Sequence, residues 1–592
     1  MNTYYSKDKN ILMLISLLKQ NNIKKVVVSP GTANVYVVAS LQYDGQFEMY
    51  SAVDERGAAY LACGLASESG EPVMLTCTGA TASRNYFPGL TEAFYRKLPI
   101  LAVTSASVDI YPHNLAPQYI DRSSQPRDTV KYSVRLPVIN SEKDIEESNL
   151  KINRAIWELH KDGGGPVHID LPTDWRGKLT EKVLPLARCI CNYTYEDDLP
   201  QIPCDYKTAI IVGAHMKWTK ELMVAIETFC ERYNSVVLVE HSSGYRGRYH
   251  VKPTVLAAQE MYVSPCFSVD LLIHIGNTIG DVYTNRRLTY AKSVWRVSKD
   301  GLLRDTFKRL SKNFEMDETF FFEAYNKKAE EKKDLSFFNE LNFESQKILE
   351  SLPDIPFSSI WAARTIVGSI PEFSNVHLGI GNVMRAFNLF HFPKGINATA
   401  NTGGWGIDGA LSTGLGISLV DPKKLTFIFL GDLAFFYDMN SLGNRHVGHN
   451  LRIMLLNNGK GVEMRIHESG VQKNLGDLAD YFSAAGGHFG NQSRKLVKHY
   501  AENLGFKYLS ADSEESFLIS MSEFVDSSNC EKPIVFEVFT SDKEEREAWY
   551  RICNIYSDPK IATKRKIANI LGDKGVEVAI KCRQSVIKMI NK

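Results

Sequence analysis

Short apolar runs alternate with amphipathic stretches along most of the chain. Between residues 10 and 175 the runs read KKVVVSP, PVMLTCTG, LPILAVTSA and GPVHIDLP, and helical stretches such as ERGAAYLACGLASES separate them. Runs that are apolar throughout are typical of strands that a parallel sheet buries on both faces. The pattern therefore predicts a doubly wound parallel-sheet domain over residues 1–180.

The same alternation recurs twice further along the chain. TAIIVGAHM, SVVLVEHSS and DLLIHIGNTIG predict a second doubly wound domain over 200–340, and VHLGIGN, LTFIFLGD, LRIMLLNN and KPIVFEVFT predict a third over 355–545. Apolar residues at helical spacing in GVEVAIKCRQSVIKMI predict a helical tail over 546–592. We expect this tail to pack on the core, with a lid over a site as the alternative. The fold class is therefore α/β, with three doubly wound parallel-sheet domains and a helical C-terminal tail, and no strict internal repeat is visible.

Composition and charge limit the classes of function that the chain could have. At 592 residues the chain is too long for one hydrophobic core, and 44% hydrophobic with 23% charged residues is typical of a globular enzyme. A formal net charge of +1 gives no field that would attract nucleic acid or a membrane, so we expect neither partner. Ten cysteines without CxxC pairs predict neither a zinc site nor disulfides. Because the N-terminus is amphipathic rather than signal-like, we expect a cytoplasmic protein.

Two predicted strands of the third domain end in polar residues. LTFIFL is followed by Gly431 and Asp432, and LRIMLL by Asn457 and Asn458. Open parallel sheets bind ligands at the carboxyl ends of their strands, so a carboxylate and an amide oxygen would converge if these strands are neighbours. With a backbone carbonyl of the GKG turn and diphosphate oxygens, they would form an octahedral Mg²⁺ site. The alternative is that Asp432 caps the next helix and Asn458 fills a turn.

Residues 430–461, LGDLAFFYDMNSLGNRHVGHNLRIMLLNNGKG, resemble the diphosphate-binding signature of thiamine diphosphate-dependent enzymes, in which GD is followed by NN. VVVSPGT, DERGAAYLACGLASESGEPVMLTCTGATASRNYFPGLTEAF, GGPVHIDLP and NTGGWGIDGALSTGLG are similar to other motifs of that superfamily, in the same order. Within it the chain resembles the 2-succinyl-5-enolpyruvyl-6-hydroxy-3-cyclohexene-1-carboxylate synthase family of menaquinone biosynthesis, with features of acetolactate synthases.

This resemblance implies roles for individual residues. Glu55 matches the carboxylate that hydrogen-bonds the cofactor's aminopyrimidine, and Ile407 matches the apolar side chain against which the cofactor bends. The alternatives are a first-turn Glu favoured by the helix dipole and plain core packing. The implied cofactor contacts are Pro30, Gly31, Glu55, Thr78, Asn85, Gly406, Ile407, Gly431, Asp432, Leu433 and Asn458, and the implied magnesium ligands are Asp432, Asn458 and the carbonyl of Lys460.

Substrate-side candidates follow from the same resemblance. Gln118, in LAPQYIDR, matches a glutamine that faces the substrate, with an exposed loop position as the alternative. Glu463 and His467 lie just past the magnesium loop, where carboxyl and imidazole groups can move protons. Structural roles stay open for both residues. His113, His446 and His449 are further imidazole candidates.

The substrate contacts depart from the family pattern. Arginines of that pattern are replaced by Ala33, Ser107, Phe387 and Thr402, and a Lys-Arg pair is absent from GNTIGDVY, with Arg286 and Arg287 nearby. Each charge-assisted hydrogen bond contributes roughly 1.5–3 kcal/mol, so losing several would weaken carboxylate binding strongly. Other basic residues that could rebuild an anion site, or simply be surface cations, are Arg56, Arg84, Arg385, Lys460 and Arg465.

We therefore expect a thiamine diphosphate- and Mg²⁺-dependent enzyme that decarboxylates a 2-oxo acid and transfers the acyl-anion equivalent to an acceptor, or releases it as an aldehyde. The missing cations favour a donor smaller than 2-oxoglutarate, such as pyruvate, and a sugar derivative as acceptor. The alternatives are the 2-succinyl synthase itself, which uses isochorismate and 2-oxoglutarate, and a non-catalytic cofactor-binding protein. The resemblance implies a homodimer or homotetramer with active sites between subunits. No FAD is expected, because the dinucleotide fingerprint is missing.

Overall fold

The computed structural model describes residues 4–107, 118–122, 124–174, 176–215, 218–329, 334–466, 470–488, 493–528 and 531–559. The chain divides into two compact units, one of Met1–Asp198 with Asp300–Glu315 and the other of Leu199–Lys299 with Met316–Lys592. The candidates His113 and His467, and the segment GVEVAIKCRQSVIKMI of the predicted tail, lie outside the described residues.

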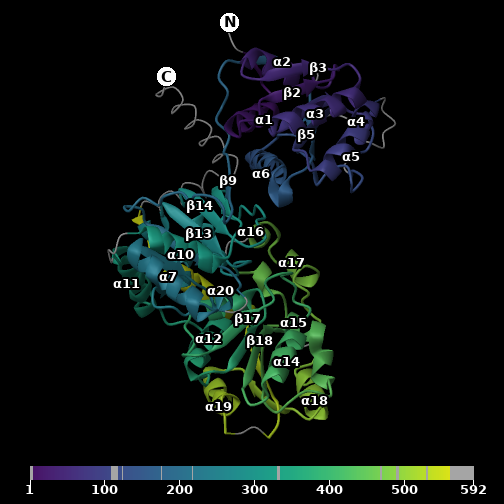
Figure 1. Ribbon diagram of the computed structural model, residues 1–592. Helices are drawn as coiled ribbons and strands as arrows, with labels where there is room; N and C mark the ends of the chain where they lie inside the picture. Colours follow the sequence, from purple (N-terminus) through teal and green to yellow (C-terminus); the bar gives the residue numbers. More distant parts are fainter. Residues whose placement is uncertain are drawn as a thin grey trace. The chain divides into compact units, whose positions relative to one another are not determined.

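The first unit holds a six-stranded parallel sheet (Figure 1). Its strands are β2 (Lys25–Val28), β3 (Glu48–Ser51), β4 (Val73–Thr78), β5 (Ile100–Ser107), β6 (Tyr132–Arg135) and β7 (Val167–Thr173). They lie in the order β3-β2-β4-β5-β7-β6, and every pair is parallel.

Helices cover both faces of this sheet. They are α1 (Lys9–Gln20), α2 (Val35–Asp44), α3 (Glu55–Ser69), α4 (Thr81–Asn85), α5 (Phe87–Arg96) and α6 (Glu142–Glu158). Val26 packs in the cluster formed by α1, α2 and α6, whereas the adjacent Val27 packs in the cluster formed by α3 and α5. Because successive strand residues face opposite sides, both positions must be apolar, which explains the uninterrupted runs.

The first unit also contains two short strand pairs. β1 (Tyr5–Ser6) pairs antiparallel with β8 (Leu179–Glu181). β9 (Cys191–Tyr193) pairs parallel with β15 (Leu310–Phe314), which lies in the segment Asp300–Glu315 of the same unit.

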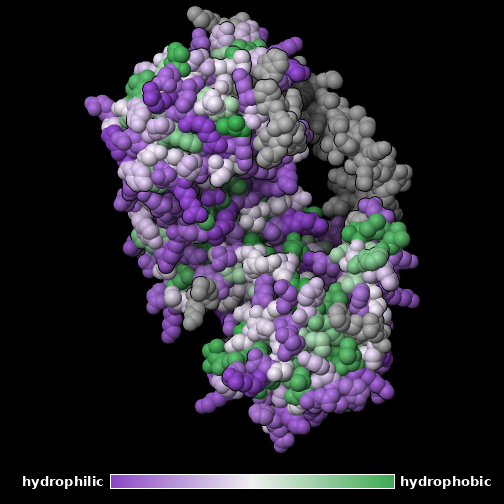
Figure 2. Space-filling view, turned by 90° about the vertical axis from the view of Figure 1, so that its right-hand side faces the viewer, coloured by the Kyte–Doolittle hydropathy of each residue, from purple (hydrophilic) through white to green (hydrophobic). Residues whose placement is uncertain are grey.

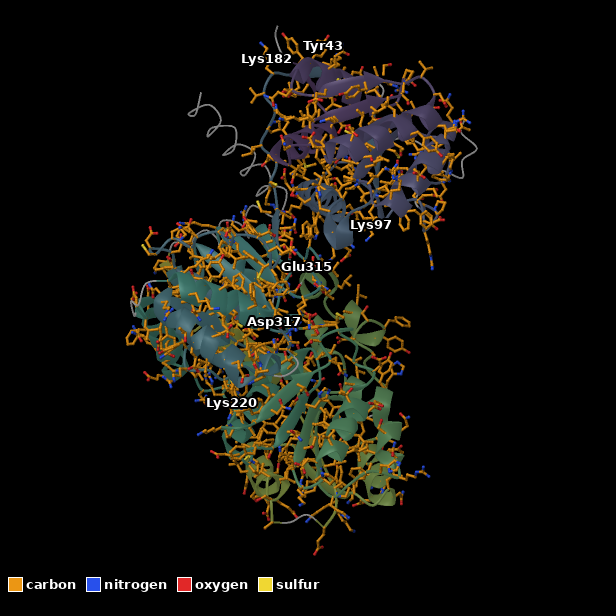
Figure 3. The ribbon with its side chains drawn as sticks, viewed as in Figure 1. Tyr43, Lys97, Lys182, Lys220, Glu315 and Asp317 are labelled. Atoms are coloured by element: carbon orange, nitrogen blue, oxygen red, sulfur yellow. The ribbon has the colours of Figure 1, made fainter. Side chains whose placement is uncertain are left out.

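The second unit contains two further parallel sheets. Strands β10 (Thr208–Val212), β11 (Ser235–Leu238), β12 (His250–Val251), β13 (Leu271–Ile275) and β14 (Ser293–Val297) lie in the order β12-β11-β10-β13-β14. Lys220 begins α7 and Asp317 caps α10 by accepting a hydrogen bond from the Thr319 N–H; both residues are labelled in Figure 3. The helices of this region are α7 (Lys220–Arg232), α8 (Thr254–Ala258), α9 (Val282–Leu288), α10 (Glu318–Lys328) and α11 (Ser336–Glu350).

The last sheet has six strands in the order β17-β16-β18-β19-β21-β20, again all parallel. The strands are β16 (Asn375–Leu378), β17 (Asn397–Ala400), β18 (Thr426–Gly431), β19 (Leu451–Asn457), β20 (Lys507–Ala511) and β21 (Ile534–Phe539). Its helices are α12 (Ser359–Ile366), α13 (Asn382–Asn388), α14 (Ala410–Val420), α15 (Asp432–Asp438), α16 (Gly470–Leu475), α17 (Leu478–Tyr481), α18 (Leu496–Asn503), α19 (Glu514–Phe524) and α20 (Asp542–Cys553).

The first and last sheets share one topology. Counted along the chain within each sheet, the strands of both follow the order 2-1-3-4-6-5, whereas the five strands β10–β14 follow 3-2-1-4-5 among themselves. The predicted fold class, with three doubly wound parallel sheets, is confirmed. The sequence shows no repeat because the two matching sheets share an arrangement of strands and not a pattern of side chains.

Helix α20 packs against the core on two sides. The buried Glu545 carboxylate accepts hydrogen bonds from the backbone N–H and hydroxyl of Ser359 at the start of α12. The indole of Trp549 is fully buried, and the Cys553 carbonyl accepts a hydrogen bond from the Glu260 N–H. The predicted boundary between 545 and 546 therefore falls inside a helix, and the domain limits stay a prediction.

The surface is largely polar. Figure 2 shows a face on which hydrophilic residues predominate and hydrophobic residues gather in separate patches. Among the described residues, no helix combines the length and the hydropathy needed to cross a bilayer.

Candidate active site

The carboxyl edge of the first sheet carries four of the predicted cofactor contacts. Pro30 and Gly31 follow β2, Thr78 ends β4, and Glu55 follows β3 as the first residue of α3. A Cβ at Gly31 would lie 1.9 Å from the Cγ2 of Thr78, so only glycine allows these two turns to meet. The sheet thus brings together turns that are far apart in sequence.

Glu55 is held by a capped helix start. The Asp54 side chain accepts hydrogen bonds from the N–H groups of Arg56 and Gly57, which fixes the first turn of α3. The Glu55 side chain is half-buried. Burial raises the pKa of Cys77 to about 12 and that of Tyr86 well above its usual value, and the nearby charge of Glu55 adds to both shifts. The carboxylate therefore lies close to buried groups beneath this edge.

A cavity of about 380 Å³ opens beside these turns. Gln118 lines it, with a backbone φ of +63°, so the structure places this predicted residue at a hollow and not on a featureless loop. Ala33 and Ser107, two of the positions without the family arginine, also line it. None of the described residues that line the cavity is charged; the others are Thr32, Thr78, Gly79, Ser105, Ala106, Tyr119 and Thr173.

Arg122 is a buried cation next to this cavity that the sequence reasoning missed. Its Nη2 donates to the Asp170 carboxylate at 2.5 Å, and both side chains are buried. A Cβ at Gly79, which lines the cavity, would lie 2.3 Å from its Nη1. The Nη1 and Nε atoms have no hydrogen-bond partner among the described residues. In the sequence, the one feature that could have pointed to Arg122 is its position four residues after Gln118.

Asn85 belongs to α4, the short helix that follows β4. It ends α4 and is exposed. Among the described residues no hydrogen bond joins it to Glu55, Gly31 or Thr78, and its cofactor role stays a prediction.

The carboxyl edge of the last sheet brings Asp432 and the double Asn together. β18 and β19 are parallel neighbours in register Gly431 with Leu456, so Asp432 and Asn457 leave the sheet side by side. The Asp432 carboxylate accepts hydrogen bonds from the N–H of Leu433 at 2.8 Å and of Gly459 at 2.7 Å. Gly459 has a φ of +81°, a conformation that favours glycine. Burial raises the pKa of Asp432 to about 7.

The two asparagines have different roles. Asn457 is buried and donates to the Glu537 carboxylate at 2.7 Å, so it ties β19 to β21. Asn458 is half-buried, and its amide oxygen accepts from the Lys460 N–H at 3.4 Å. The Lys460 carbonyl accepts from the Val462 N–H at 2.9 Å and keeps a second lone pair. Asn458 and Lys460 therefore share one tight turn opposite Asp432.

These residues fit a magnesium–diphosphate group. Asp432 is a nearly desolvated carboxylate, which a divalent cation would compensate. A Cβ at Gly431 would meet nothing within 4 Å, so there is space for a ligand in front of the strand end. No cluster of three or more His, Cys, Asp and Glu side chains within the described residues suits a metal alone, so phosphate oxygens would have to complete this one.

Three more predicted contacts surround this edge. Ile407 is half-buried and packs against the core cluster that contains α14 and α15 residues. Gly406 precedes it, after Trp405 with a φ of +55°. Leu433 is half-buried in the first turn of α15. The apolar packing of Ile407 is compatible with both the cofactor role and the core role.

Glu463 lies near the same edge, but it is paired. Arg385 Nη2 lies 2.8 Å from its Oε1. A Cβ at Gly381, in the turn that follows β16, would lie 3.4 Å from its Oε2. His446 and His449 instead precede β19, at the opposite end of the strand from Asn458. Because seven residues of strand span about 23 Å, neither imidazole is near this edge.

The basic residues that could rebuild an anion site are engaged elsewhere. Arg465 pairs with Asp477 at 2.5 Å and with Asp480 at 3.1 Å, and Lys460 pairs with Asp480 and Asp542, each at 3.1 Å. Arg84 donates to the Asp121 carbonyl at 2.7 Å. Arg56 lies 3.8 Å from Asp54, and Arg287 donates to the carbonyls of Ala257, Gln259 and Tyr262. Partners within the fold thus account for these cations.

Phe387 and Thr402 are buried where the family pattern has arginines. The Phe387 ring stacks on Phe429 at 4.4 Å between centroids. These two positions are part of the core and offer no charge to a substrate.

Replacing Gly31 by alanine is expected to lower the free energy of unfolding by about 1–3 kcal/mol and to weaken cofactor binding, because the new methyl overlaps Cγ2 of Thr78. Thermal denaturation with and without thiamine diphosphate measures both effects. The double variant Gly31→Ala/Thr78→Ser lacks that methyl and should recover most of the stability, relative to Thr78→Ser alone. A double variant as unstable as Gly31→Ala would exclude this contact as the cause.

Comparison with known proteins extends these observations. A family model described as "Thiamine pyrophosphate enzyme, N-terminal TPP binding domain" matches residues 12–124. The chain is 31% identical over 574 residues to the 2-succinyl-5-enolpyruvyl-6-hydroxy-3-cyclohexene-1-carboxylate synthase of Bacteroides thetaiotaomicron, covering 91% of this chain and 97% of that protein. Proteins of the same name from Bacteroides fragilis and Flavobacterium psychrophilum are 30% and 27% identical, covering 91% and 90% of this chain and 98% and 96% of their own.

Proposed function

Because the chain belongs to the family of thiamine diphosphate-dependent 2-succinyl-5-enolpyruvyl-6-hydroxy-3-cyclohexene-1-carboxylate synthases, we propose that it joins a succinyl unit, derived from 2-oxoglutarate with loss of CO₂, to isochorismate. The observation that carries this proposal is similarity along nearly the whole chain to proteins of that name. It favours the synthase over the smaller donor and sugar acceptor expected from the missing arginines.

Two sheet edges hold the cofactor in this proposal. When bound, thiamine diphosphate supplies the nucleophilic carbon and the electron sink for decarboxylation. Glu55 would hold a proton at the aminopyrimidine, and Ile407 would pack against the cofactor. Asp432, Asn458 and the Lys460 carbonyl would hold Mg²⁺, and Gly431 would leave room for the diphosphate. The short turns at both edges are what support these assignments.

The half-sites lie in different compact units of the chain, Glu55 in one and Asp432 in the other. We propose that they are completed between subunits of a homodimer or homotetramer, as the family resemblance implies. The location proposed is the cytoplasm, in keeping with free thiols at all described cysteines.

Substrate contacts are assigned to the cavity at the first sheet. Gln118 lines it and donates or accepts hydrogen bonds there. Arg122 offers the free Nη1 and Nε donors of a buried guanidinium to a carboxylate, which would compensate in part for Ala33 and Ser107. Glu463 stays a candidate proton carrier once its pairing with Arg385 is released, and His467 a candidate without a described position.

An NMR-followed assay tests this function. Purified protein with thiamine diphosphate and Mg²⁺ is supplied with 2-oxoglutarate or pyruvate, each with and without isochorismate. Loss of 2-oxoglutarate that requires isochorismate and yields one new C–C product is the expected result. Consumption of pyruvate in preference to 2-oxoglutarate would overturn the proposal. It would instead support a donor smaller than 2-oxoglutarate, which the uncharged lining of the cavity favours.

A further inference from the structure

A second cavity, of about 100 Å³, lies within the second compact unit, and none of the residues assigned to the cofactor lines it. Its walls are the end of β11 with the loop that follows, the start of β12, and the segment 391–398 that leads into β17. β17 contacts the short turn His241–Ser243, so these segments are true neighbours. The basic and imidazole side chains that line the cavity are His241, Arg246, His250, Lys252 and His391, and the one lining carboxylate is that of Glu240.

Lys252 is a buried cation that faces this cavity without an acceptor. The residue is 7% exposed, and its Nζ lies 3.3 Å from Nε2 of His241. That same Nε2 lies 2.8 Å from the carbonyl oxygen of Phe387, which can only accept. Nε2 must therefore carry the hydrogen, and it has no lone pair left for the ammonium. No other hydrogen-bond partner of Lys252 occurs among the described residues.

The nearby carboxylates already accept hydrogen bonds from other groups. The Glu240 carboxylate accepts from the Ser242 hydroxyl and the Gly280 N–H, both at 2.6 Å, and from the Asn388 amide at 3.1 Å. Asp281 accepts from the hydroxyls of Thr254 and Thr284 and caps α9. Neither carboxylate is in hydrogen-bond contact with Lys252, so its charge is balanced only at a distance.

Further donors point to the same ligand chemistry. His250 binds the Gly247 carbonyl through Nδ1, which leaves Nε2 for another partner. Arg246 is exposed at the cavity and forms no ion pair with a described residue. Unused donors and positive charge thus outnumber acceptors.

The groups around the cavity repel one another in their charged forms. Burial lowers the pKa of Lys252 to about 7, and the charge of Lys252, together with burial, lowers the pKa of His391 to about 3. A bound anion would remove this repulsion and supply the acceptors that the site lacks.

We propose that this cavity binds a tetrahedral oxyanion, free phosphate or sulfate or the phosphate group of a small metabolite, with the Lys252 ammonium as its central contact. The volume suits one such group. The segment 391–398, which carries His391 and continues into β17, forms one wall, so the bound anion bridges this segment to the end of β11.

Equilibrium dialysis with radiolabelled sulfate tests the site. Saturating thiamine diphosphate and Mg²⁺ are present so that the diphosphate site cannot take up sulfate. Wild-type protein should bind one sulfate per chain saturably, and Lys252→Met should weaken binding at least tenfold. Lys394→Met is the matched control, because Lys394 is an exposed lysine of the same segment that does not line the cavity. Displacement of sulfate by glycerol 3-phosphate would identify a phosphate monoester as an accepted ligand, and displacement by inorganic phosphate alone would identify a free ion.

The pH dependence gives a second readout. Sulfate keeps its charge between pH 6 and 9, whereas Lys252 loses its proton as the pH rises through about 7. Wild-type affinity should therefore fall over this range. The other titratable groups that face Lys252 are Glu240, His241, Arg246, His250, Asp281 and His391. Lys252→Met should show a much flatter profile.

The outcomes separate this site from the proposed function. Lys252→Met removes a buried charge, so its melting temperature should not fall, and lost binding cannot then be attributed to unfolding. Absence of saturable binding, or equal binding by Lys252→Met and wild type, overturns the proposal. Sulfate binding that is sensitive to Lys252 and persists in Asp432→Asn would stand even if the protein had no synthase activity.

Discussion

Glu55→Gln is expected to reduce turnover at least about a hundredfold while thiamine diphosphate still binds. Placing a proton donor or acceptor at the reacting group typically contributes a factor of about 10²–10⁴, and the amide cannot supply or take up that proton. The side chain begins α3, whose first turn is fixed by Asp54 and not by Glu55, so the fold should persist. Turnover of 2-oxoglutarate with isochorismate and cofactor binding by tryptophan fluorescence measure the two effects.

Glu68→Gln is the matched control for this variant. Glu68 lies on the same helix, is exposed, and is far along the helix from the sheet edge. It should keep wild-type turnover. If wild type and Glu55→Gln were both inactive yet bound the cofactor equally, the protein would be a cofactor-binding module and not an enzyme of this family's reaction.

Asp432→Asn is expected to abolish the stabilisation that Mg²⁺ and thiamine diphosphate give together. At about one hundred times its Kd, a ligand raises the free energy of unfolding by about 2.7 kcal/mol, and this increment should nearly vanish in the variant. The free protein should stay folded, because removal of a buried charge offsets the loss of one hydrogen bond from Leu433 or Gly459. Melting temperatures with and without the ligands give the comparison.

Asp438→Asn is the control, and we expect it to have the opposite effects on the stability of the free protein and on the stabilisation by ligands. Asp438 is equally buried at the other end of α15, but it accepts from Ser412 and Ser441 inside the fold. This variant should lower the melting temperature of the free protein and keep the ligand-induced increase. A normal ligand-induced increase in Asp432→Asn would exclude this carboxylate from the metal site.

The parallel sheets were predictable because burial on both faces leaves a direct mark on the sequence. Val26 and Val27 pack in the clusters on opposite faces of the sheet, so both must be apolar. Runs that are apolar throughout are typical of such doubly covered strands. The sharing of one strand order by the first and last sheets was not predictable. Strand order depends on which distant segments pair, and the connecting helices carry no local signal for it.

The polar residues at the ends of strands could also be predicted from the sequence. Asp432 and Asn458 follow apolar runs, and the register of β18 with β19 brings their turns together. What the sequence did not reveal is how charges pair. Arg465 and Lys460 share Asp480 and Asp542, and Arg122 pairs with Asp170, across separations in sequence that no motif records. The cluster around Lys252 likewise combines two distant segments, so only the folded chain shows it.

The packing of Phe387 limits which side chains position 387 can accept. Its ring is fully buried and stacks on Phe429, at a position where the family pattern has arginine. Returning arginine there in one step would place an unpaired guanidinium inside the core, which strongly destabilises a fold. An arginine at this position would thus be tolerated only together with changes at Phe429 or its neighbours that open the core to a charge.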